Sequence, residues 1–143
     1  MSQMRLPCAL TADDLNRFLS ENFADWVRDL ALDVTEVTES HTISRMPNSD
    51  RLARVGGIIS GQALMTMADT TMVLATAGFF GSFRPGATTN VTCQCLRPGV
   101  GDWIVCRADI VRAGKSMAFV EAEMLAEPSG KPVARAQATF YVV

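Results

Sequence analysis

One carboxylate, Asp69, stands inside the apolar segment SGQALMTMADTT, which covers residues 60–71. Methionines and alanines surround it, so few neighbouring side chains could pair with its charge. Desolvation makes an unpaired carboxylate costly, and such acids are candidates for general base or nucleophilic chemistry. A structural alternative stays open, in which Asp69 points to a loop or bonds Thr70, Thr71 or backbone of another element.

Gly61 supplies the complementary group for such chemistry. Near a helix start its backbone N–H has no partner within the helix, and the helix dipole favours negative charge there. This N–H can therefore hold a developing oxyanion, and a glycine lets a substrate carbonyl come close. Gly61 and Asp69 are 8 residues apart, which is about 12 Å along a helix. One carbonyl cannot touch both, so cooperation requires two chains with antiparallel helices around a two-fold axis.

The segment that carries both residues predicts a long buried helix. From about residue 58 to 77 it is apolar on nearly all sides, which is typical of a helix enclosed by protein. Glycines and a proline in residues 78–86 end it. An N-terminal helix is predicted from Thr11 to Leu30, because Thr11 and Asp14 form a capping box before apolar residues at helical spacing.

The remaining segments predict strands. Residues 33–46 are rich in Val, Thr and Ile, and residues 87–96, 102–113, 116–126 and 132–142 alternate with period two. Small residues share one face of the last two strands, which leaves room for a helix to lie close. We predict one α+β domain over residues 1–143, with an N-terminal helix and lead-in over 1–30 and the core over 31–143.

Composition narrows the class of protein. The net charge is −2, and the Lys and Arg residues are scattered along the chain without forming a basic stripe. We therefore do not expect nucleic acid as a partner. No apolar run approaching the length of a membrane span is recognised, and the first residues lack a signal peptide, so we expect a cytoplasmic protein without a membrane partner. The four cysteines form no C-x-x-C pair, so no metal site is expected, and Cys93 and Cys95 are predicted to act as small apolar strand residues. His41 is predicted to be solvated or hydrogen-bonded.

Four segments, in this order and spacing, resemble hotdog-fold thioesterases of the phenylacetate-degradation (PaaI) type: GGIISGQALMTMADTT, ATTNVTCQCLRPGVGDW, VRAGKSMAFVEAEM and GKPVARAQATFYVV. The likeness covers about residues 30–143. It implies the hotdog fold, a long helix wrapped by an antiparallel sheet, which agrees with the α+β prediction above. It also implies hydrolysis of acyl- or aryl-coenzyme A thioesters without a metal or other cofactor. The assembly is expected to be a homo-oligomer, and the choice between a homodimer and a homotetramer stays open.

The resemblance implies roles for particular residues. Gly61 is the helix-start amide that polarises the thioester carbonyl, and Asp69 acts as nucleophile or as general base on water. Thr88 matches a hydroxyl residue that positions the attacking water. Ser60 stands where many members have histidine, and Arg54 stands where a side-chain amide is frequent. Arg54 could bond a thioester oxygen, pair with Asp69 or be a solvated loop residue.

Substrate binding is expected from basic residues at loop tips, because coenzyme A carries phosphates. Arg112 and Lys115 around Gly114 are the first choice and Arg97 the second, although each could be a plain surface charge. Gln62 and Thr70 are further candidates for substrate contact. Apolar residues suggest an acyl pocket, but a core or a subunit contact would contain them equally: Met65, Met72, Phe79, Phe80 and Phe83.

Two other functions on the same scaffold are considered. A non-hydrolytic acyl-coenzyme A binding or sensing domain is the alternative, motivated by Ser60 and Arg54. A hydratase or dehydratase is disfavoured because such enzymes pair the acid with a catalytic histidine, and His41 lies too early in the chain.

Overall fold

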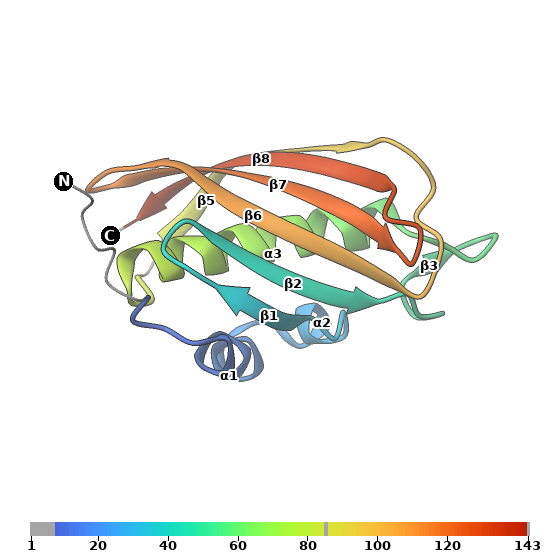
Figure 1. Ribbon diagram of the computed structural model, residues 1–143, viewed down its shortest axis with the longest axis horizontal. Helices are drawn as coiled ribbons and strands as arrows, with labels where there is room; N and C mark the ends of the chain where they lie inside the picture. The colour runs from blue at the N-terminus through green and yellow to red at the C-terminus, as the bar shows by residue number, and fades with distance from the viewer. Residues whose placement is uncertain (1–7, 85, 143) are drawn as a thin grey trace.

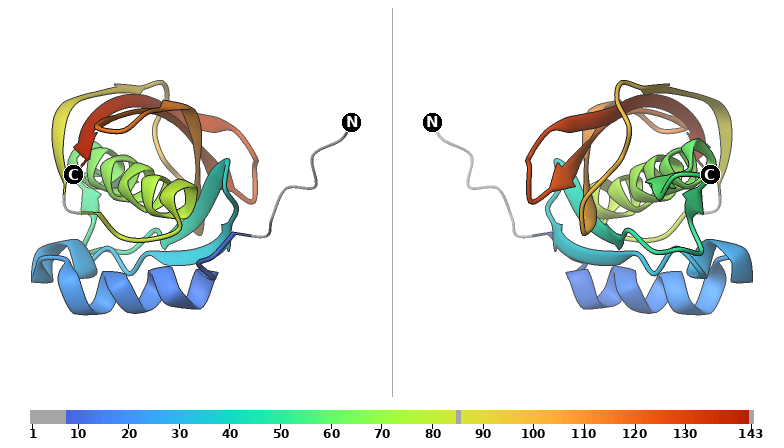
Figure 2. Two further views of the ribbon diagram at one scale, coloured as in Figure 1. Left: turned by 90° about the vertical axis from the view of Figure 1, so that its left-hand side faces the viewer. Right: turned by 90° about the vertical axis from the view of Figure 1, so that its right-hand side faces the viewer.

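The computed structural model describes residues 8–84 and 86–142, which form an antiparallel sheet curved around one long helix (Figure 1). The helix α3 (Gly61–Phe80) runs inside the curve, and α1 (Ala12–Asn22) with the short α2 (Asp25–Arg28) lies outside it, next to the first strands (Figure 2). The predicted α+β class and the hotdog arrangement are both confirmed.

Six strands form the main sheet in the order β1-β2-β6-β7-β8-β5. Their bounds are β1 Asp33–Val37, β2 His41–Pro47, β5 Gly86–Cys95, β6 Trp103–Ala113, β7 Met117–Glu127 and β8 Pro132–Val142. Every neighbouring pair is antiparallel. The strands β3 (Ala53–Arg54) and β4 (Ile58–Ile59) form a separate hairpin just before α3.

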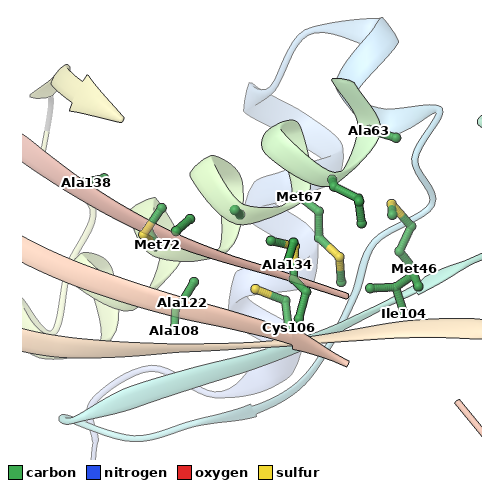
Figure 3. Packing of buried hydrophobic residues seen from close by; sticks show 14 of the residues in the cluster. Met46, Ala63, Met67, Met72, Ile104, Cys106, Ala108, Ala122, Ala134 and Ala138 are labelled. Carbon is green, nitrogen blue, oxygen red and sulfur yellow. The ribbon is translucent and has the colours of Figure 1, made fainter. Parts of the chain in front are cut away.

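The core forms where α3 meets the concave face of the sheet. Met67 and Met72 of the helix are fully buried, and small side chains of the strands lie beside them (Figure 3). The predicted small-residue faces are confirmed, because all these residues are buried: Ala118, Val120, Ala122, Met124, Ala134, Ala136, Ala138, Phe140 and Val142. Small strand residues let the helix approach the sheet closely, and this close packing holds α3 in place.

Several predicted boundaries are corrected. The N-terminal helix ends at Asn22 because Phe23 and Ala24 are extended, and Phe23 packs edge-on against Phe18. Residues 33–46 form two strands instead of one, because the hydroxyl of Thr38 binds the backbone N–H of Ser40 in a turn.

The central helix is also shifted from its predicted position. It begins at Gly61 instead of residue 58 because Ile58 and Ile59 pair with β3. It continues to Phe80, where Gly81 takes the left-handed conformation (φ 73°) and donates its N–H to the carbonyl of Ala77.

The prediction that no apolar segment approaches the length of a membrane span is wrong for α3. An 18-residue stretch of this 20-residue helix has a mean hydropathy of 1.3, and 61% of that stretch is buried inside the domain. Core helices of soluble proteins also show such length and composition. Its high hydropathy is thus accounted for by the sheet that surrounds it.

Candidate active site at the start of α3 and the edge strand β5

Ser60 caps the start of α3 and leaves the next amide free. Its Oγ accepts a hydrogen bond from the N–H of Ala63 at 3.2 Å, and its carbonyl accepts from the N–H of Leu64 at 3.1 Å. Gly61 is the first residue of the helix, and within residues 8–84 and 86–142 no backbone or side-chain acceptor binds its N–H. The free amide predicted from sequence is therefore present. Ser60 has a structural task here as a helix cap.

Asp69 lies on the face of α3 that is turned toward β5. Thr88, on that strand, donates its hydroxyl to Oδ1 of Asp69 at 3.1 Å. Burial raises the pKa of the Asp69 carboxyl, and the hydrogen bond from Thr88 opposes part of this rise. A hydrogen bond between Asp69 and Thr71, one of the structural alternatives, does not form, because the hydroxyl of Thr71 binds Ser44 and the carbonyl of Met67. A half-buried carboxylate with a raised pKa is suited to take up a proton.

A pocket of about 290 Å³ opens at the start of α3. Gly61, Arg54, Arg97 and Cys95 line it together with apolar side chains. Neither arginine forms an ion pair with any residue that the structure describes. The pairing of Arg54 with Asp69, one of the three alternatives for Arg54, therefore does not form within one chain. Two unpaired guanidinium groups and a helix start make this pocket attractive to an anionic ligand.

The position of Cys95 was missed by the sequence prediction. A β-carbon built on Gly61 would lie 3.8 Å from Sγ of Cys95, so the thiol lies beside the glycine at the same pocket. Cys95 is exposed, contrary to its prediction as an apolar filler. For Cys93 the prediction is confirmed: it is half-buried, and burial raises the pKa of its thiol to about 11, with a contribution from Cys95. The alternation in β5 already placed both thiols on one face, which is the face toward α3.

The remaining candidates lie apart within one chain. Arg112 lies near the end of β6, and Gly114 and Lys115 follow it in the β6–β7 turn, at the end of the molecule where α3 ends (Figure 1). Gln62 is exposed beside Gly61, whereas Thr70 is buried with 4% of its surface exposed. Within one chain, the β6–β7 turn is therefore far from the pocket at the start of α3. The substrate-binding roles of these residues stay predictions.

Two other features do not contribute to this site. His41 is hydrogen-bonded to Thr38 and Glu36, as predicted, and three strands separate β2 from β5 in the sheet. A hollow of about 470 Å³ on the outer face of the sheet is larger than the pocket at α3. Its lining includes Glu121, Glu123 and Arg135 but neither Gly61 nor Asp69, so we place the chemistry at the smaller pocket.

Residues 56–133, more than half of the chain, match the sequence model of the Thioesterase superfamily. The chain belongs to this superfamily. A relative in Thermoplasma acidophilum that carries an esterase name is 28% identical over 118 residues, which are 82% of this chain and 87% of that protein. The matched range includes the whole of α3 and β5, so the free amide and the acid both lie in the part that defines the superfamily.

Several solved structures share the fold. The thioesterase HI1161 of Haemophilus influenzae superposes with a TM-score of 0.83 at 19% identity, covering 94% of this chain and 91% of its own. The PaaI protein of E. coli gives a TM-score of 0.78 at 19% identity, covering 92% and 93%. At this identity the likeness establishes the hotdog fold, whereas the PaaI type stays a prediction.

Replacing Thr88 with valine tests the link between the hydroxyl and the acid. Because the hydrogen bond from Thr88 lowers the pKa of Asp69, its loss should raise that pKa further. We expect the acid limb of the kcat profile for thioester hydrolysis to move to higher pH, with turnover recovering once Asp69 is ionised. A stopped or continuous thiol-release assay from pH 5 to 9 measures this shift. Thr89→Val, whose hydroxyl binds the carbonyl of Thr139, is the matched control and should leave the limb in place. An unshifted limb in Thr88→Val would contradict the prediction.

Proposed function

We propose that this superfamily member hydrolyses acyl- or aryl-coenzyme A thioesters at a site shared by two chains. The observation that carries the proposal is the pairing of an unbonded helix-start amide at Gly61 with a half-buried acid, Asp69, on the same helix. Their 8-residue separation, about 12 Å along the helix, exceeds the reach of one carbonyl. A second chain with an antiparallel α3 supplies the missing half of each site.

The chemistry follows from these two groups. The N–H of Gly61 of the partner subunit binds the thioester oxygen, which makes the carbonyl carbon more electrophilic and stabilises the oxyanion. Asp69 either removes a proton from water, whose oxygen attacks the carbon, or attacks the carbon itself to form an anhydride that water then opens. In both routes the C–S bond breaks, the sulfur leaves as thiolate and takes up a proton, and the carboxylic acid is released. Thr88 holds the carboxylate in place through its hydroxyl.

A coenzyme A thioester suits the pocket because of its charge. Arg54 and Arg97 line the pocket beside Gly61 and have no ion-pair partner among the residues described. Phosphate groups form strong charge-assisted bonds with guanidinium groups. Arg112 and Lys115, at the end of the molecule opposite the pocket, would reach a phosphate only in the assembled oligomer. Neither a metal ion nor another cofactor takes part in the proposed chemistry.

Mixing two disabled chains tests the shared site directly. Asp69→Asn removes the acid and Gly61→Pro removes the amide, so each homodimer should keep only a small residual turnover. A mixed dimer, purified with two different affinity tags after co-expression, contains one site with both groups intact. We expect it to regain about half of the wild-type turnover per dimer, since one of its two sites is whole.

The control is a doubly tagged dimer in which both chains carry Asp69→Asn, which should stay inactive. A mixed dimer no more active than this control would refute the shared site. If wild-type protein binds acyl-coenzyme A by calorimetry but releases no thiol, the binding or sensing alternative replaces the hydrolase.

A further inference from the structure

The pocket at the start of α3 contains one nucleophile that the proposed chemistry does not use, the thiol of Cys95. The other described residues of its lining are two arginines, glycines, a proline and aliphatic side chains. No carboxylate, imidazole or hydroxyl group belongs to this described lining, and Asp69 lies outside it. Within the described pocket, the side-chain atom able to attack a carbonyl carbon is therefore a sulfur.

The four cysteines all belong to the described part of the chain, and Cys95 alone is exposed. Cys93 is half-buried on the same face of β5, and burial raises the pKa of its thiol to about 11. Cys106 lies in the packed core (Figure 3), where burial raises the pKa of its thiol to about 12. Because the thiolate is the attacking form, these two thiols stay inert at neutral pH. Cys8 is at the other end of α3, where its thiol donates to the carbonyl of Gly78 at 3.4 Å.

The sulfur of Cys95 is close enough to the free amide of Gly61 for both to act on one carbonyl. A β-carbon on Gly61 would lie 3.8 Å from Sγ. The amide nitrogen is two bonds of about 1.5 Å from that position, so Sγ lies within about 7 Å of the nitrogen. An oxygen that accepts from this N–H at about 2.9 Å places its carbonyl carbon about 4 Å from the nitrogen. The carbon can then lie about 3 Å from the sulfur, which is the separation of reacting atoms.

The thiol and the acid reach this carbonyl from different chains. Asp69 is about 12 Å along the helix from Gly61 of its own chain, so the proposed site takes its acid from the partner. Cys95 lies beside Gly61 within one chain. A thioester held by this amide therefore faces a thiol from the same chain and a carboxylate from the other. Two such groups around one carbonyl allow hydrolysis in two steps.

We propose that Cys95 is the nucleophile of this hydrolase and accepts the acyl group from coenzyme A before water does. The thiol gives its proton to water, and the thiolate attacks the carbonyl carbon while the N–H of Gly61 holds the oxyanion. The C–S bond to coenzyme A breaks, and the acyl group stays on Cys95 as a new thioester. The coenzyme A thiolate takes up a proton from water. No other reactant is needed, because one thioester replaces another.

The second step releases the carboxylic acid. The partner's Asp69 removes a proton from water, whose oxygen attacks the carbonyl carbon of acyl-Cys95 at the same amide. The C–S bond to Cys95 breaks, and its thiolate takes up that proton. The inference rests on the proposed function, because it uses the same amide and the same acid. It makes Asp69 the base instead of the nucleophile and adds a covalent intermediate.

Asp69→Asn in the full chain should trap this intermediate, because it blocks the second step and leaves the thiol and the amide in place. Wild type is assayed with acetyl-, butyryl-, hexanoyl- and benzoyl-coenzyme A, and the thioester hydrolysed fastest is mixed with Asp69→Asn protein. We expect a burst of about one coenzyme A per chain, and a chain heavier by one acyl group. Peptide mass spectrometry should place this group on Cys95. Excess free coenzyme A should remove it, since the exchange is reversible.

Three further substitutions in the Asp69→Asn background serve as controls. Cys95→Ala should lose both the burst and the added mass. Cys8→Ser, which removes the thiol at the other end of α3, should keep both. Gly61→Pro removes the oxyanion donor and should slow the acylation by about 10²- to 10³-fold. Acylation that persists in Cys95→Ala, or that Gly61→Pro does not slow, would be ordinary thiol chemistry outside the site and would overturn the inference.

The outcomes separate this inference from the proposed function. If Asp69→Asn stops turnover but its chains gain no acyl group, the shared site stands and acyl-Cys95 is refuted. The same conclusion follows if Cys95→Ala alone keeps the kcat of wild type. If wild-type protein takes up an acyl group on Cys95 but releases no carboxylic acid, the transfer to the thiol stands and the proposed hydrolysis is refuted.

Discussion

Asp69→Asn will lower kcat for acyl-coenzyme A hydrolysis by about 10²- to 10⁴-fold, the range for loss of a positioned acid–base group. Asparagine keeps the shape of the side chain and can still accept the hydrogen bond from Thr88, so the geometry around position 69 is retained. It can neither take up the proton of water nor attack the thioester carbon. Thiol release followed by a chromogenic reagent, with a panel of acyl and aryl thioesters, measures the loss.

Folding of this variant provides its internal control. Burial raises the pKa of Asp69 in the folded chain above its value in the unfolded chain. The contribution of this carboxyl to the free energy of unfolding therefore falls as the pH rises from the unfolded pKa through the folded pKa. The ionised carboxylate is therefore the costly form at neutral pH, and asparagine removes that cost. We expect Asp69→Asn to melt at the same or a higher temperature than wild type at pH 7. Full turnover by a folded Asp69→Asn protein would end the assignment of the acid.

Gly61→Pro should lower kcat/KM by about 10²- to 10³-fold, the usual loss when one oxyanion donor is removed. Proline is well tolerated at the first position of a helix, where its missing N–H has no intrahelical partner. Ser60 already has φ −68° and ψ 149°, which is the conformation that a residue before proline adopts. The substitution thus removes the donor while the helix start remains compatible. Circular dichroism and the thiol-release assay measure fold and activity on the same sample.

Gly61→Ala is the matched control for this donor. Alanine keeps the N–H, and its β-carbon would meet Sγ of Cys95 at 3.8 Å, an ordinary contact. The methyl group leaves less room for the substrate carbonyl but does not remove the hydrogen bond. The loss of kcat/KM in Gly61→Ala should therefore be smaller than in Gly61→Pro. Equal kinetics in the proline and alanine variants would mean that the amide of Gly61 does not act on the substrate.

Much of the fold was predictable because burial repeats locally. Period-two alternation predicted β5 to β8 to within one residue at each end, and the small residues of β7 and β8 were assigned to the correct face. The apolar composition of residues 58–77 predicted α3, since a helix enclosed by a sheet is apolar all round. The β3–β4 hairpin was missed because two residues per strand are too few to show a period.

Part of the candidate site was also predictable from the sequence. The amino-acid sequence alone was enough to single out Asp69 as an acid in apolar surroundings, Gly61 as a free helix-start amide, and their separation as too long for one carbonyl. Those conclusions depend on residue type and on the 1.5 Å rise of a helix, which are local quantities. Thr88 entered through a family resemblance, and its bond to Asp69 joins positions 19 residues apart.

Contacts between distant segments were decided by the tertiary structure. The thiol of Cys95 beside Gly61, the hydrogen bond from the N–H of Val34 to Asn16 and the place of β5 as the last strand of the sheet all depend on strand order, curvature and register. The register of β5 against β8 shifts between Thr88 and Asn90, which changes the position of every later residue of the strand. Periodicity does not encode such shifts, because they result from the packing of the whole sheet around α3 and not from any one strand.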